Sequence, residues 1–139
     1  MLLVDDAHEA QVAVYLTYAA AAGSTFIDRA LYLPRSWTGD PARCRAAGVP
    51  QHTAFATMPA LARQMISRAL DAGTPAAWVT AGEVYGQDPA LRAELARRGL
   101  GYVLAVAKSH PVTTAIGNCP ANALAWPLPA GPGVRHEGA

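Results

Sequence analysis

Apolar and polar residues alternate along two neighbouring segments near the start of the chain. Residues 11–19 alternate cleanly, and the apolar face that this pattern predicts carries Val12, Val14, Leu16 and Tyr18. Residues 25–33 alternate less cleanly, with a predicted apolar face of Ile27, Leu31 and Leu33. Arg29 interrupts that second face and must reach solvent or a partner. A period of two with Gly23 in the turn predicts an antiparallel hairpin.

Three later segments have residues typical of helix boundaries, a proline near the start and a glycine just past the end. The predicted helices begin after Asp40, Thr57 and Asp88, and they end before Gly48, Gly73 and Gly99. The middle helix carries an apolar stripe of Leu61, Met65, Ala69 and Leu70, which core packing explains. Arg97 and Arg98 end the third helix, where they favour the negative end of its dipole. Residues 34–39 are predicted to be a loop.

Two short apolar runs flank the third predicted helix. Residues 76–81 and 101–107 are continuous apolar runs, which are typical of strands buried on both faces. With the helix between them they form a β-α-β unit, whose strands should be parallel with a right-handed crossover. A hairpin followed by helix, strand, helix and strand resembles the order of an RNase H-like α/β fold that lacks much of its first strand. Glu83 follows the first run, where α/β folds gather their chemistry.

Composition narrows the class of protein. The chain has 139 residues, 52% of them apolar, which suits one domain with a real core. Its formal net charge is +1, and Lys108 is the only lysine. A genome rich in G and C is the plain explanation for the many arginines, and phosphate binding is the alternative. No membrane-spanning run or signal segment is apparent, so we expect a cytoplasmic protein. Cys44 and Cys119 form no metal or disulfide pattern.

The texture changes after Pro111, where prolines and glycines alternate and no periodicity remains. We therefore expect one partial domain over residues 1–117 and a loose Pro/Gly-rich tail over residues 118–139. Motifs of other enzyme classes are absent from the sequence, including a Gly-rich phosphate loop, a Gly-x-Ser-x-Gly elbow and a Cys/His pair at useful spacing.

Several short motifs of the sequence occur together in a known family. Residues 80–89 read Thr-Ala-Gly-Glu-Val-Tyr-Gly-Gln-Asp-Pro, residues 28–37 contain Asp-Arg-x-Leu-Tyr-Leu-Pro-x-Ser-Trp, and residues 104–111 read Leu-Ala-Val-x-Lys-x-His-Pro. In this order they resemble IS701-type transposases of the DDE superfamily, which cut and join DNA. The resemblance implies an RNase H-like mixed sheet flanked by helices, with transposon-end DNA as partner. It also implies two Mg²⁺ ions held by three converging acids.

The acids of this chain depart from that family pattern. The family has an Asp where this chain has Gly82, and it has a late helical Glu, whereas Glu137 here lies in the tail. Residues 1–6 read Met-Leu-Leu-Val-Asp-Asp and resemble the first catalytic strand, so Asp5 and Asp6 are the candidate first acid and metal ligands, unless the similarity is coincidental. Glu83 is the third catalytic candidate. It replaces the missing Asp only if the strand ends at residue 81 and the chain turns, since in a regular strand it faces the other way.

The resemblance also makes Arg35, Tyr85, Lys108 and His110 candidates for contacts with DNA. Three of them have a structural alternative: a solvated loop for Lys108 and His110, and a core-capping ring for Tyr85. The sequence thus predicts a truncated, inactive transposase catalytic domain with Mg²⁺ not tightly bound. Two alternatives stay open. One is a non-catalytic module that binds DNA or a full-length transposase, or forms a homo-oligomer; the other is a degenerate remnant. No membrane partner is expected.

Overall fold

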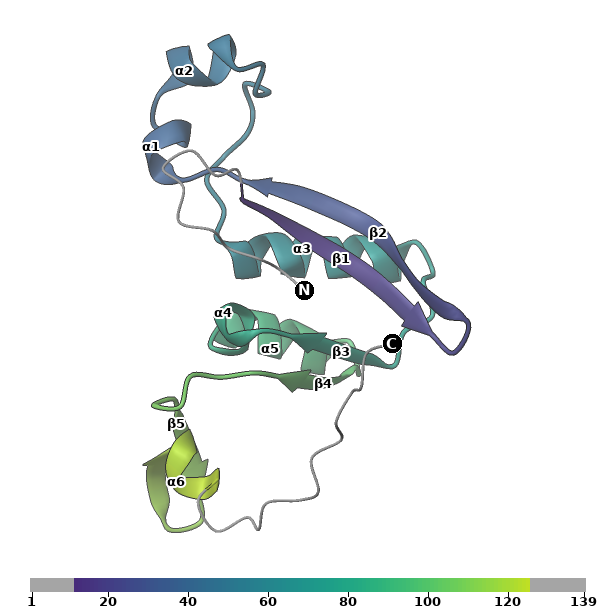
Figure 1. Ribbon diagram of the computed structural model, residues 1–139, viewed down its shortest axis with the longest axis vertical. Coiled ribbons are helices and arrows are strands. Elements are labelled where there is room, and N and C mark those ends of the chain that lie inside the picture. The colour runs from purple at the N-terminus through teal and green to yellow at the C-terminus, as the bar shows by residue number, and fades with distance from the viewer. Residues whose placement is uncertain (1–11, 126–139) are drawn as a thin grey trace, which may run out of the picture.

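The computed structural model describes residues 12–125, and all statements of structure below concern that part of the chain. It is a mixed α/β arrangement of small sheets and helices (Figure 1). In chain order the elements are β1 (Val12–Ala20), β2 (Gly23–Tyr32), α1 (Arg35–Thr38), α2 (Pro41–Ala46), α3 (Met58–Asp71), β3 (Trp78–Ala81), α4 (Glu83–Gly86), α5 (Pro89–Arg97), β4 (Gly101–Leu104), β5 (Pro111–Thr114), β6 (Gly117–Pro120) and α6 (Ala121–Ala125).

The predicted hairpin is confirmed, but one of its two predicted faces is wrong. Strands β1 and β2 pair antiparallel, and Gly23 supports the turn with a φ of 137°. Val14 is only 3% exposed and lies opposite Ala30, so Ala30 shares the inner face. Ile27 and Leu31 are exposed instead of buried. The sequence pattern of β2 was misleading because pairing with β1, including a bulge beside Leu16, sets which face turns inward.

The three predicted helices are confirmed together with their caps. The side chains of Asp40, Thr57 and Asp88 accept hydrogen bonds from backbone N–H groups of the first turns of α2, α3 and α5. The predicted loop at residues 34–39 is wrong in part, because it contains the single-turn helix α1. The backbone N–H groups of Trp37 and Thr38 both donate to the carbonyl of Pro34. A single turn is too short to leave a periodic pattern in the sequence.

The parallel pairing of β3 with β4 is confirmed, with Val79 opposite Tyr102. The prediction that these strands are buried on both faces is wrong. Trp78 is 70% exposed and Val103 is 66% exposed. Both strands are also shorter than the apolar runs that predicted them. Within the described residues their core contacts lie on one face, so an apolar run here did not mean two-sided burial.

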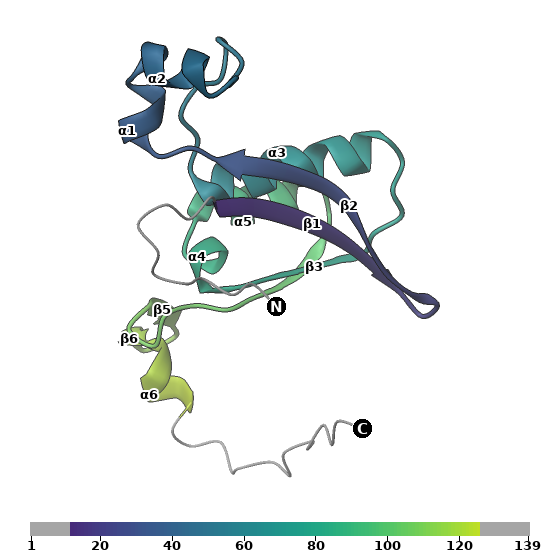
Figure 2. The same ribbon diagram turned by 45° about the horizontal axis from the view of Figure 1, so that its top comes forward.

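Within residues 12–125 the strands do not form the single mixed sheet that we predicted. The described residues form three two-stranded sheets, which pair β1 with β2, β3 with β4, and β5 with β6. Figures 1 and 2 show the hairpin and the β3–β4 pair as separate ribbons, with α3 passing beside the hairpin and α5 beside β3 and β4. Helix α3 joins the two parts because it contacts the hairpin and α5.

The prediction of a loose tail is wrong for residues 118–125. Strand β6, which pairs with β5 in a hairpin, and helix α6 occupy this part of the chain. The backbone N–H of Ala121 donates to the carbonyl of His110 and that of Asn122 to the carbonyl of Lys108, both at 2.9 Å. These bonds fasten the end of the hairpin to the loop after β4. Residues 126–139, which include the rest of the predicted tail, lie outside the described residues.

Two apolar clusters form the core. The first contains Ile66, Leu91, Leu95 and Leu100, and the second contains Val14, Ala62 and Met65. Leu16 and Tyr85 pack against both clusters and so bridge the hairpin and the β3–β4 unit. Among residues 12–125, no helix has the length and apolar character needed to cross a membrane.

Candidate functional site

The candidate site lies where β3 ends. The strand stops at Ala81, Gly82 takes an extended conformation with φ −71°, and α4 begins at Glu83. The backbone N–H groups of Tyr85 and Gly86 donate to the carbonyl of Gly82, which closes the turn. The chain therefore turns directly after residue 81. This is the condition under which Glu83 lies at the carboxyl end of the strand, and Glu83 is exposed there.

Gly86 explains why the motif needs a small residue four positions after Gly82. A Cβ atom at Gly86 would lie 1.9 Å from the carbonyl oxygen of Ala105. Only a residue without a side chain lets α4 pack so closely on the backbone that follows β4. A Cβ at Gly82 would have no atom within 4 Å. The two glycines of the motif therefore differ: one is required by packing, and the other leaves an open position.

Tyr85 belongs to the core as much as to the site. Its ring packs against both apolar clusters, and burial raises the pKa of its hydroxyl. The structural alternative for this residue, a ring that caps the core, is thus supported by its contacts. A DNA contact through its hydroxyl stays a prediction.

A second group of polar residues stands beside α4. The guanidinium Nη1 of Arg92 donates to the carbonyl of Gly86 at 2.9 Å and lies 3.4 Å from Nε2 of His110. His110 is half-buried, and Lys108 on the same loop is exposed. The structure thus brings His110 of the predicted set to the helix that carries Glu83. Arg92 was missed by sequence reasoning, since nothing in the spacing of α5 shows that its second turn reaches back to α4.

Arg35 lies on a different element from the other predicted DNA contacts. Its guanidinium carbon is 4.1 Å from the ring centroid of Phe55, and that of Arg43 is 4.0 Å from the ring centroid of Trp37. Both are cation–π contacts. They anchor α1 and α2 around two aromatic rings and leave both arginines exposed. Trp37 is thus held by Arg43 of α2.

The two arginines predicted to favour the dipole of α5 have ionic partners. Glu94 accepts hydrogen bonds from Arg97 and Arg98, and Arg98 also binds Asp71 of α3. Hydrogen bonds from Arg97 and then Arg98 lower the pKa of Glu94 to about 2, and the hydrogen bond from Arg98 lowers the pKa of Asp71. This network ties α3 to α5. It lies away from Glu83 in the fold, so we assign it a structural role.

The acids described by the structure do not fit a magnesium pair. Among residues 12–125, no three His, Cys, Asp or Glu side chains come close enough together to hold a metal ion. Asp5 and Asp6, the predicted metal ligands, lie outside the described residues. Mg²⁺ prefers several carboxylate oxygens, and no such group of side chains gathers within residues 12–125.

Comparisons with known proteins identify the family to which this chain belongs. No curated protein and no solved structure matches the chain. The model of a family described as DDE superfamily endonuclease matches residues 4–124, which is most of the chain. Such endonucleases generally use divalent metal, and their substrate is DNA. The match also includes β5, β6 and most of α6, so these elements belong to the same unit as the β3–β4 pair. The chain is therefore a member of the DDE superfamily of endonucleases.

Proposed function

We propose that this chain is part of an IS701-type transposase catalytic domain that binds DNA and does not cut it unaided. One observation carries the proposal: the turn after β3 presents Glu83 next to Gly82, and within residues 12–125 no three His, Cys, Asp or Glu side chains gather into a metal site. Two-metal phosphoryl transfer needs several carboxylates that converge on both ions. The described side chains do not meet that need.

The DNA-binding part of the proposal is supported by the placement of basic side chains. Lys108, His110 and Arg92 gather around the loop after β4 and helix α4. Helix α1, which carries Arg35, lies toward the same side of the molecule as α4 and β5 in both views (Figures 1 and 2). Lys108 and Arg35 are exposed, and exposed cations along one side can follow a phosphate backbone. On this proposal, DNA runs along that side, past the end of β3.

The test is strand cleavage and strand transfer on a duplex that carries a transposon end, with Mg²⁺ or Mn²⁺. We expect binding of the duplex and no product above the metal-only control. Turnover that disappears in Glu83→Gln would overturn the claim of inactivity. The Gly82→Asp variant is a useful companion, since the open space at that position admits the side chain that the family has there.

A second candidate function is a regulatory module that binds an intact transposase. It is favoured by a folded scaffold in which the described acids do not converge. Co-purification with a full-length IS701-type transposase would support it. A monomer that binds neither that protein nor DNA would reject both functions and leave the degenerate remnant.

A further inference from the structure

Residues 34–57 form a small lobe between β2 and α3, and arginines dominate its charge. The lobe contains α1, α2 and the segment that leads to α3. Arg35, Arg43 and Arg45 are all exposed, and Asp40 is the only acid in this stretch. Figures 1 and 2 both show α1 and α2 beyond the end of β2, away from β3 and β4. We call residues 34–57 the arginine lobe.

The single acid of the arginine lobe does not neutralise its arginines. The carboxylate of Asp40 accepts hydrogen bonds from the backbone N–H groups of Ala42 and Arg43, at 3.1 and 3.0 Å, and so caps α2. In the described part of the chain, every ion pair between an arginine and an acid lies around α3 and α5, and none lies in the lobe. Among residues 12–125, the three guanidinium groups of the lobe therefore have no carboxylate partner.

Two of these guanidinium groups are held flat on aromatic rings. The guanidinium carbon of Arg35 lies 4.1 Å from the ring centroid of Phe55, and that of Arg43 lies 4.0 Å from the ring centroid of Trp37. A cation–π contact uses the face of the guanidinium group and leaves its charge and the N–H donors at its edge available. That planar fork of donors matches the oxygens of a phosphate. Stacking thus orients two forks before a ligand arrives, which lowers the entropy that binding costs.

The aromatic ring under Arg35 is itself fastened to the hairpin. The ring of Phe55 meets that of Tyr32 in β2 edge to face, with the two centroids 6.4 Å apart. The segment after α2 is also tied back onto that helix, because the backbone N–H of Val49 donates to the carbonyl of Cys44 at 2.9 Å. The stack that positions Arg35 therefore also joins the arginine lobe to the hairpin.

We propose that the arginine lobe is a binding site for the phosphate backbone of DNA, separate from the end of β3. The inference rests on the proposed function and deepens it, since it adds Arg43 and Arg45 and a second point of contact along the duplex. Contacts to phosphates carry no base sequence, so the lobe holds any duplex. An acidic protein segment offers the same forks carboxylates. DNA is favoured because it is the substrate of the matched family.

The position of the arginine lobe agrees with a duplex that passes the candidate site. In Figure 1, α1 and α2 lie at one end of the long axis and β5 and α6 lie at the other, with α4 between them; Figure 2 keeps this order. Lys108 lies on the loop that leads into β5. DNA that contacts both the lobe and Lys108 therefore crosses the carboxyl end of β3, where Glu83 lies.

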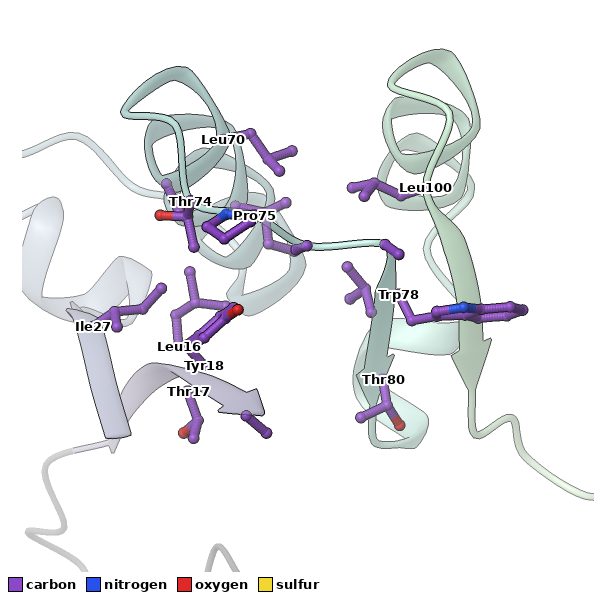
Figure 3. Close-up of a pocket in the computed structure, with 16 residues that line it drawn as sticks. Leu16, Thr17, Tyr18, Ile27, Leu70, Thr74, Pro75, Trp78, Thr80 and Leu100 are labelled. Carbon is purple, nitrogen blue, oxygen red and sulfur yellow. The ribbon is translucent and has the colours of Figure 1, made fainter. Parts of the chain in front are cut away.

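A groove of about 330 Å³ between β1 and β3 offers no such contact. Figure 3 shows Leu16 and Tyr18 on one side of this groove, Trp78 on the other, and Leu70 and Leu100 along the helices. None of the residues that line it carries a charge. A phosphate there would lose water without gaining a cation, which is unfavourable. The DNA therefore follows the exposed arginines and not this groove.

The test measures the affinity of the full chain for a DNA duplex by fluorescence anisotropy over a range of salt concentrations. Arg45→Ala is the main variant, because within residues 12–125 Arg45 stacks on no ring and its loss leaves both stacks in place. We expect weaker binding and a slope of log K against log salt reduced by about one. Arg29→Ala, on the exposed face of the hairpin, is the matched control and should leave the slope unchanged.

The variants Arg35→Lys and Arg43→Lys test the contribution of the oriented forks. Each keeps the positive charge and loses the planar fork, so the affinity should fall about threefold or more while the salt slope stays the same. Thermal unfolding of each variant, compared with the parent, shows whether the loss of a stack has unfolded the chain. Arg45→Ala remains decisive if either lysine variant does not fold.

Three results would overturn the proposal, and they separate it from the proposed function. If Lys108→Ala lowers the salt slope while Arg45→Ala and both lysine variants bind like the parent, the chain binds DNA without the arginine lobe. If the parent binds polyglutamate as tightly as the duplex, and Arg45→Ala weakens both equally, the lobe recognises acidic protein segments instead. If the parent binds no duplex, this proposal and the proposed DNA binding both fail.

Discussion

At the scale of single residues, the two glycines of the motif differ in whether packing requires them. Gly86 is buried against the backbone at Ala105, and any side chain there would collide with it. Gly82 has open space around its Cα and a φ of −71° that any residue adopts. The packing of the fold therefore does not require a glycine at position 82. If Gly82 replaces the family's Asp, as the resemblance implies, no contact of the described residues accounts for that replacement.

Substituting each glycine by alanine tests this distinction. Gly86→Ala should lower the free energy of unfolding by about 1–3 kcal/mol or more, because the added methyl group forces α4 away from the backbone after β4. Gly82→Ala should change it by less than about 1 kcal/mol. Chemical denaturation of the two variants and the parent measures both values. Equal losses in the two variants would contradict the close approach of α4.

At the scale of elements, the sequence was informative where local signals act alone. The caps at Asp40, Thr57 and Asp88 and the glycines after the helices fixed α2, α3 and α5, because capping involves only neighbouring residues. The turn at Gly23 fixed the hairpin in the same way. Features set by distant partners were not predictable: the inner face of β2 depends on its register with β1, and the exposure of Trp78 depends on what covers the sheet.

The same limit applies to the candidate site. The sequence Gly82-Glu83 after an apolar run was enough to predict that a strand ends close to Glu83. Whether the chain turns directly after residue 81, and so places Glu83 at the carboxyl end of the strand, could not be decided from the sequence; the structure shows that turn. The approach of Arg92 to Gly86 and His110 was not predictable, since it depends on how α5 packs beside α4. The short β5–β6 hairpin was missed because its strands have four residues each and carry turn-forming Pro and Gly.

The ionic network between α3 and α5 makes stability depend on pH. The pKa of Glu94 is lowered from an ordinary value of 4.5 to about 2 in the folded chain, and that of Asp71 is lowered as well. A carboxyl group whose pKa is lowered in the folded chain stabilises the fold at pH values above its pKa in the unfolded chain. This stabilisation is lost as the pH falls through the pKa of the folded chain. Stability should therefore decline between about pH 4.5 and pH 2.

The matched variant is Glu94→Gln, which keeps the shape of the side chain and removes its charge. Thermal unfolding measured from pH 7 to pH 2 should show a smaller decline in this variant than in the parent. An unchanged slope in Glu94→Gln would mean that the ion pairs with Arg97 and Arg98 do not contribute to the acid sensitivity of the fold.

At the scale of the whole molecule, helix α3 and the bridging side chains Leu16 and Tyr85 hold the hairpin and the β3–β4 unit together. The groove between β1 and β3 and the carboxyl end of β3 are therefore presented by one folded body. We expect the DNA chemistry of this superfamily at the carboxyl end of β3.

Binding of DNA along the side that carries Lys108 predicts a specific salt dependence. Lys108→Ala should weaken binding of any duplex sequence and reduce the slope of log K against log salt by about one, as expected for the loss of one phosphate contact. Arg29→Ala, on the exposed face of the hairpin, removes the same charge elsewhere and should leave the slope unchanged. Fluorescence anisotropy over a range of salt concentrations measures both. Identical slopes in the two variants would place the DNA on another surface.

We propose that this chain keeps a DDE endonuclease domain while its acids, of which the described ones do not converge, hold no metal pair. Titration of the full chain with Mn²⁺, followed by calorimetry and by the relaxation of water protons, tests this proposal most directly. We expect that no pair of Mn²⁺ ions binds saturably, and that Glu83→Gln gives the same titration curve as the parent. Two Mn²⁺ ions bound per chain, with binding lost in Glu83→Gln, would contradict it.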